Sequence, residues 1–75
     1  MMAEVTNVTL LEDIANTEKE VEAYRQLAEG YRTLASLPEN DNQEYVNLAR
    51  HYNSLCDECR TFLGKLNKIK TERGL

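Results

Sequence analysis

The first half of the chain carries apolar or small residues at helical spacing. They recur three and four positions apart, which is the period of one face of an α-helix. This face consists of Leu10, Ile14, Thr17, Val21, Tyr24, Ala28, Tyr31 and Ala35. Thr9 and Glu12 fit a capping box at its start, because the hydroxyl accepts from a free backbone N–H while the carboxylate reaches back. The pattern predicts a first helix over about residues 9–37.

The second half shows a stricter heptad pattern. Apolar residues alternate three and four positions apart at Tyr45, Leu48, Tyr52, Leu55, Cys59, Phe62, Leu66 and Ile69. This spacing is typical of a helix that packs lengthwise against another helix. Basic residues near position 70, with Gly74 beyond them, suit the end of a helix. The pattern predicts a second helix over about residues 43–70.

Residues 38–42 break both patterns. Pro38 pushes Leu37 out of the helical region, and the following Asn and Asp residues favour turns. Asp41 with Glu44 gives a second capping signal. A short turn between two long helices makes them antiparallel neighbours. The chain is therefore predicted to be a single all-α domain over residues 1–75, an antiparallel, coiled-coil-like two-helix hairpin.

The hairpin fixes which residues face each other across the seam, meaning the positions of each helix that face the other helix. It pairs Ile14 with Leu66, Thr17 with Phe62, Ala28 with Tyr52, and Ala35 with Tyr45. Residues 1–44 sum to a charge of −7 and residues 45–75 to +3. The register therefore places acids beside bases: Glu12, Asp13, Glu18 and Glu20 next to Lys65, Lys68, Lys70 and Arg73. Each exposed pair contributes only about 0–1 kcal/mol, but together they disfavour other pairings.

The apolar surface exceeds what two helices bury against each other. Two further rows adjoin the predicted seam, Leu11, Leu27 and Leu34 on the first helix and Ala49, Cys56 and Leu63 on the second. Exposed apolar ridges of this size mark interfaces. We therefore expect the hairpin to be completed by dimerisation or by a helical protein partner. The predicted partner-binding residues are Leu11, Leu27, Leu34, Tyr45, Ala49, Tyr52, Cys56, Phe62, Leu63 and Leu66.

Cysteine and histidine often act in catalysis or bind metals, but here their positions predict a structural role. Cys56 and Cys59 have redox-motif spacing but lie in mid-helix, whereas reactive pairs usually sit at a helix N-terminus. A zinc site needs four ligands, and His51 points elsewhere on the helix from Cys56. A two-helix hairpin also offers no pocket for acid–base work by His51. We predict no catalytic residue, no metal site, no cofactor and no enzymatic activity.

Charge and hydropathy narrow the possible partners and location. The net charge of −4 and the pI of about 4.9 argue against nucleic acid or an anionic membrane as the partner. No apolar run approaches the roughly 18 residues that a membrane span requires. The first residues lack the basic and continuous apolar regions of a secretory signal. We therefore expect a cytoplasmic protein whose cysteines are reduced.

A few positions resemble a known family. Thr9, Leu11, Glu12 and Asp13, followed by Asp41, Gln43 and Tyr45, resemble the leucine–acid start and the Gln-x-Tyr entry to the second helix in small co-chaperones of type III secretion needle proteins. The similarity covers roughly residues 9–70, and Asn42 stands where the closest pattern has Pro. The resemblance implies a non-catalytic role in the bacterial cytoplasm. The hairpin would pair with a larger tetratricopeptide-like chaperone and hold a needle subunit unpolymerised.

Two other functions fit the same pattern. A homodimeric four-helix bundle could act as a regulator of RNA or transcription through Lys65, Lys68 and Arg73. The acidic first helix could instead serve as a decoy in a phage-type inhibitor of a nucleic-acid enzyme.

Overall fold

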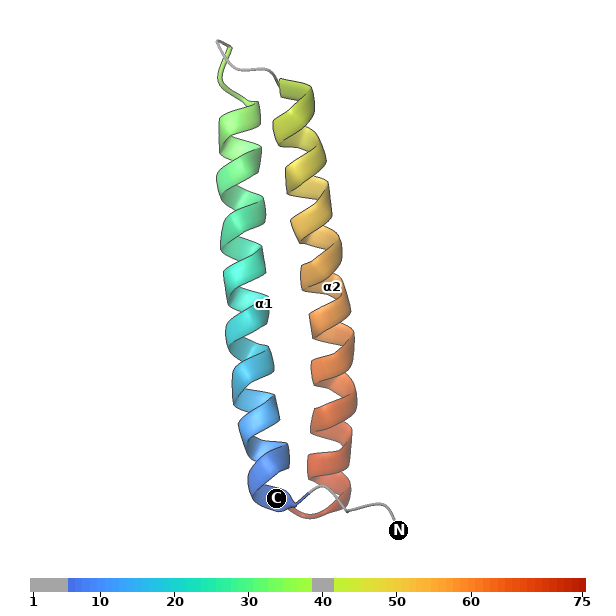
Figure 1. The fold of residues 1–75 in the computed structure, drawn as a ribbon. Coiled ribbons are helices and arrows are strands. Elements are labelled where there is room, and N and C mark those ends of the chain that lie inside the picture. The colour runs from blue at the N-terminus through green and yellow to red at the C-terminus, as the bar shows by residue number, and fades with distance from the viewer. Residues whose placement is uncertain (1–5, 39–41) are drawn as a thin grey trace.

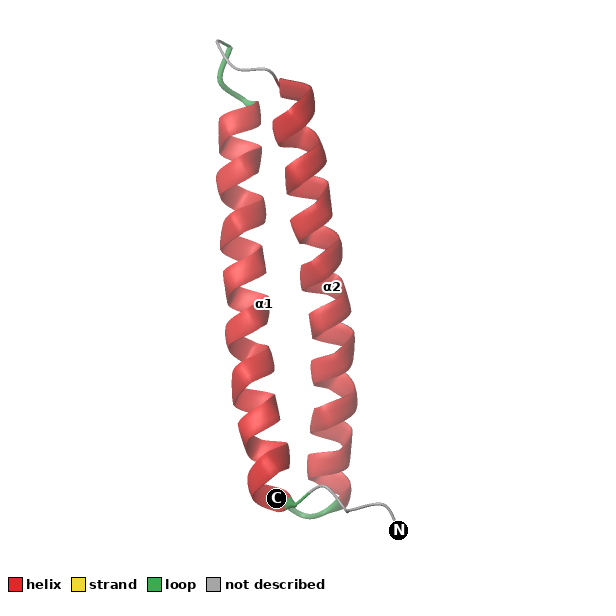
Figure 2. Ribbon diagram, viewed as in Figure 1, coloured by secondary structure: helices red, strands yellow, loops and turns green. Residues whose placement is uncertain are grey.

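Two long helices pack side by side. The computed structural model describes residues 6–38 and 42–75. Helix α1 spans Asn7–Ala35 and helix α2 spans Asn42–Glu72. They run antiparallel in a rod about 55 Å long (Figure 1). The described residues contain helix and loop but no strand (Figure 2), which confirms the all-α hairpin.

Helix α1 begins earlier than predicted. Thr6 is its N-cap in an extended conformation, and the Thr6 Oγ1 accepts a hydrogen bond of 3.1 Å from the backbone N–H of Thr9. Such a bond satisfies one of the free N–H groups of the first turn. The predicted capping box at Thr9 and Glu12 is therefore wrong, because both residues already lie inside the helix. The predicted cap at Asp41 lies outside the described residues.

Both helix ends have a local physical cause. Helix α1 ends at Ala35, two residues before the predicted end, in the segment that leads to Pro38. Helix α2 ends in a Schellman arrangement around Gly74, whose φ of 72° suits glycine. The backbone N–H of Leu75 donates to the Lys70 carbonyl, and that of Gly74 donates to the Thr71 carbonyl, each at 3.0 Å.

The seam differs between the two halves of the hairpin. In the end half (residues 6–21 and 56–75), Leu10, Ile14 and Leu66 form a buried cluster with Leu63 packed against it. This cluster confirms the predicted pairing of Ile14 with Leu66. It is small, and a chain this short depends on few such contacts.

In the turn half (residues 22–38 and 42–55), the seam is aromatic. The rings of Tyr24, Tyr52, Tyr31 and Tyr45 stack in that order, with centroids 6.1, 5.6 and 6.2 Å apart. Tyr52 thus lies between two rings of α1, opposite Ala28, as the predicted register requires. We call these four residues the tyrosine ladder. Each ring stays half-buried, so its hydroxyl can remain near water.

Candidate protein-binding surface

Every second seam position of α2 differs by one residue from the predicted one, while Tyr45, Tyr52 and Leu66 face α1 as predicted. Ala49 and Cys56 are buried, whereas Phe62 is 51% exposed. Assigning Leu48, Leu55, Phe62 and Ile69 to the seam, and Ala49, Cys56 and Leu63 to the flank, was therefore wrong. The pairing of Thr17 with Phe62 was wrong as well.

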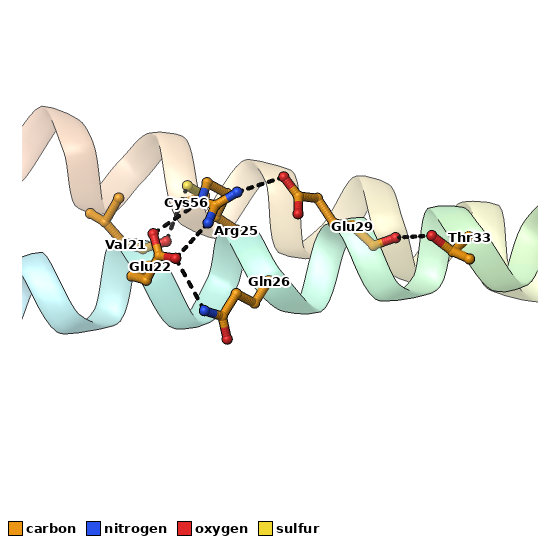
Figure 3. Close-up of polar contacts among 7 residues, drawn as sticks. All are labelled: Val21, Glu22, Arg25, Gln26, Glu29, Thr33 and Cys56. Carbon is orange, nitrogen blue, oxygen red and sulfur yellow. Dashed lines mark hydrogen bonds and ion pairs between the residues drawn. The ribbon is translucent and has the colours of Figure 1, made fainter.

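One contact shows how this row packs. The thiol of Cys56 donates to the Val21 carbonyl at 3.5 Å, so this seam position lies directly against the backbone of α1 (Figure 3). Leu63, in the same row, packs against the cluster of Leu10, Ile14 and Leu66. The other apolar row of α2 lies on the flank, where Leu48 and Leu55 are half-buried and Ile69 is exposed.

One side of the hairpin now carries an apolar row on each helix. Every residue of these rows comes one position before a seam residue, as Leu27 precedes Ala28 and Leu55 precedes Cys56. A step of one residue turns a helix by about 100°, and in an antiparallel pair the positions before the seam share a side. We call this set the apolar face; it consists of Leu27, Leu34, Leu48, Leu55, Phe62 and Ile69.

The apolar face is hollowed near both ends of the rod. In the end half, Phe62, Ile69 and Asp13 line a groove of about 810 Å³ over Leu10 and Leu66. In the turn half, a hollow of about 510 Å³ lies on α1. Its lining consists of Ala23, Gln26, Leu27, Gly30, Tyr31 and Leu34.

Leu11 does not belong to this face. It comes one position after the seam residue Leu10, so it lies on the opposite flank from Leu27. Its side chain is nevertheless 43% exposed, almost the same as the 42% of Leu27.

The predicted partner-binding residues thus fall into separate groups. Leu27, Leu34 and Phe62 lie on the apolar face, and Leu11 lies on the opposite flank. Tyr45 and Tyr52 belong to the tyrosine ladder. Ala49, Cys56, Leu63 and Leu66 face α1 within the seam. The apolar face also contains Leu48, Leu55 and Ile69, which the sequence pattern had placed in the seam.

The opposite flank is mostly polar, with Leu11 and Val46 among the exceptions. Arg25, which follows seam residue Tyr24, lies between two carboxylates of its own helix (Figure 3). Its Nη1 is 2.6 Å from Glu29 Oε1, and its Nε donates to Glu22 Oε2 at 3.0 Å. Hydrogen bonds from Arg25 and then from Gln26 lower the pKa of Glu22 to about 2. Glu22 therefore stays ionised even at mildly acidic pH.

The predicted ion pairs between the helices do not form. Among the described residues, the ion pairs join Arg25 to Glu22 and Glu29 and Arg60 to Asp57, all within one helix. No ion pair in these parts of the chain links an acid of α1 to the three lysines of α2. Arg73 does reach α1, where its Nη1 donates to Asn7 Oδ1 at 3.2 Å.

The two cysteines are free thiols. Cys59 Sγ lies 3.7 Å from Glu20 Oε2, and burial together with this carboxylate raises the pKa of the Cys59 thiol. A reactive redox cysteine needs the opposite shift, because the thiolate is the nucleophile. Residues 6–38 and 42–75 contain no group of three or more His, Cys, Asp or Glu side chains arranged to hold a metal ion. His51 is exposed and packs edge-on against Tyr52, with ring centroids 5.3 Å apart.

The geometry therefore concentrates its binding capacity on the apolar face. Its leucines and aromatic ring repeat every seven residues along α2, a spacing that suits contact with another helix. Neither helix of the described chain is apolar enough over a sufficient length to cross a lipid bilayer. Comparison of the chain with protein-family models, with curated proteins and with solved structures finds no match.

Proposed function

We propose that this protein is a non-catalytic binding module whose apolar face receives the helices of a protein partner. The observation that carries the proposal is the extent of that face, which follows α2 from Leu48 to Ile69 and α1 at Leu27 and Leu34 on one side of the rod. By contrast, few apolar side chains are buried inside the hairpin itself: Leu10, Ile14, Ala28, Ala49, Cys56 and Leu66. On the apolar face, Leu27, Phe62 and Ile69 are exposed, as many large apolar side chains as the core buries in Leu10, Ile14 and Leu66.

Burial of this face supplies the driving force. Full burial of a Leu, Ile or Phe side chain contributes about 1.5–3 kcal/mol, and Phe62 and Leu27 each keep about half of their surface in water. A partner that covers several such side chains also stabilises the hairpin, because it binds only the folded form.

The resemblance to needle-protein co-chaperones supports a narrower form of the proposal. The hairpin would act in the bacterial cytoplasm, docked on a tetratricopeptide-like chaperone through the apolar face. That pair would hold a needle subunit and keep it from polymerising before export.

Co-purification tests both levels of the proposal. The full chain is co-expressed with the tetratricopeptide-like chaperone and the needle subunit of the same genome. We expect a stable complex that Phe62→Glu disrupts and Leu11→Glu preserves, because only Phe62 belongs to the apolar face. A complex that tolerates Phe62→Glu, and also tolerates Leu55→Glu, would contradict the assignment of that face. Absence of any complex with these two proteins would refute the co-chaperone role.

A further inference from the structure

We infer that the apolar face closes on a second copy of this chain when no other partner is present. The two hairpins lie with their turns at the same end, and the resulting four-helix bundle places each α1 between two α2 helices. The inference rests on the proposed function only in using the same face. It concerns the purified chain alone. The dimer can therefore be absent while partner binding holds, and the dimer can form while partner binding fails.

The exposed area of the hairpin matches what a dimer would cover. The chain exposes 5703 Å² for a mass of 8.6 kDa. A folded monomer of that mass exposes about 4,700 Å², so the chain as a whole exposes roughly 1,000 Å² more. A standard protein–protein interface buries about 800 Å² on each partner. One interface of ordinary size therefore removes most of the excess.

The two halves of the apolar face complement each other in shape. On α1, the small residues Ala23 and Gly30 lie in the hollow beside Leu27. A Cβ atom built on Gly30 meets nothing within 4 Å, and its φ is not positive, so the hairpin itself gives no reason for glycine. At the same height along the rod, α2 presents Leu48 and Leu55. A two-fold axis along the rod places these leucines over the hollow of the other copy.

Charge favours the same orientation. With the turns at one end, each acidic α1 gains a second α2 as its neighbour. The long-range attraction between the acids of α1 and the bases of α2 then acts both within each hairpin and between the two copies. The reverse orientation sets the acidic α1 of one copy against the acidic α1 of the other, which brings like charges together.

Sedimentation equilibrium of the purified full chain tests the dimer. We expect twice the monomer mass at micromolar to millimolar concentration, and a single copy for Leu27→Glu. Leu11→Glu is the matched control, because it adds the same charge to the same helix at an equally exposed leucine on the opposite flank. Gly30→Leu should also dissociate the dimer, since it fills the hollow while raising helix propensity. Circular dichroism confirms that each variant remains helical.

Three results would overturn the inference. These are a folded wild-type chain that stays monomeric at millimolar concentration, a dimer that survives both Leu27→Glu and Gly30→Leu, or an assembly larger than a dimer.

The distance between spin labels on the two copies, measured by double electron–electron resonance, tests the orientation. A spin label is attached at Ser36→Cys in a chain that also carries Cys56→Ala and Cys59→Ala, with helicity checked as above. Labels near the turns should lie within about half the rod length of each other if the turns share one end. A distance close to the 55 Å length of the rod would show the reverse orientation and refute the proposed bundle.

Discussion

Replacing each glycine inside a helix by alanine measures how much that glycine lowers the stability of the hairpin. Gly30 lies in α1 and Gly64 in α2, and neither has a positive φ. A Cβ atom at either position meets no other atom within 4 Å, so alanine is accommodated without any rearrangement. Gly in a helix interior is less favourable than Ala by about 0.8–1.0 kcal/mol. Each substitution should therefore stabilise the free hairpin by nearly that full amount.

Urea denaturation followed by far-UV circular dichroism measures the effect. We expect the free energy of unfolding to rise by about 1 kcal/mol for Gly30→Ala and for Gly64→Ala, measured in the Leu27→Glu background so that the chain is monomeric. With a denaturant slope of about 1 kcal/mol per molar urea for a protein this small, the midpoint rises by about 1 M. The two effects should add, because the glycines lie on different helices far apart along the rod.

A loss of stability at either position would refute this reasoning. It would mean that the added methyl group meets an obstacle and that the surface around that glycine is not open. In the wild-type background the two variants should diverge. Gly64→Ala should keep its full gain, while Gly30→Ala should gain less at high protein concentration, because its Cβ enters the space that the second copy occupies.

Three further predictions concern the core, the thiol and the polar flank. Leu10 is 1% exposed, so Leu10→Ala should cost about 2–5 kcal/mol and abolish the cooperative melt of this small hairpin; an unchanged melt would contradict its core position. Because the pKa of Cys59 is raised, stability should fall as pH rises above the ordinary thiol pKa of 9.0, and alkylation by iodoacetamide should need higher pH than for free cysteine. Glu20→Gln should move that alkylation profile part of the way back, and no movement would exclude the carboxylate as a cause. Since the pKa of Glu22 is lowered to about 2, its contribution to stability should be present above pH 4.5 and be lost as pH falls toward 2. An NMR titration should place its midpoint there, and Arg25→Gln should return it toward 4.5.

The sequence predicts the hairpin well because helical spacing and a single proline leave few alternatives. The α1 side of the seam is unambiguous, since only one row of that helix is apolar along its whole length. Helix α2 has two adjoining apolar rows, and hydrophobicity alone favours the bulkier one. In the structure the other row faces α1, where Cys56 contacts the Val21 carbonyl. That choice depends on the volume left by the opposite helix, which no single helix pattern contains.

The start of α1 shows a second limit of prediction from the sequence. A threonine followed three residues later by glutamate is the stronger sequence signal, and it favoured Thr9 over Thr6. The structure uses Thr6 with Thr9, where the hydroxyl and the backbone N–H of Thr9 both contact Thr6. The ion pairs predicted between α1 and α2 are not found among the described residues. Opposite charges at the same height along the rod form a pair only when their side chains reach each other across the flank.

The tyrosine ladder gives the molecule its own optical reporter. The chain has four tyrosines and no tryptophan, and all four rings lie in the turn half of the hairpin. Near-ultraviolet dichroism and intrinsic fluorescence at tyrosine wavelengths therefore register the closure of that half, while the end half carries Phe62 as its aromatic residue. Separation of the two helices in the turn half can thus be followed without attaching any dye.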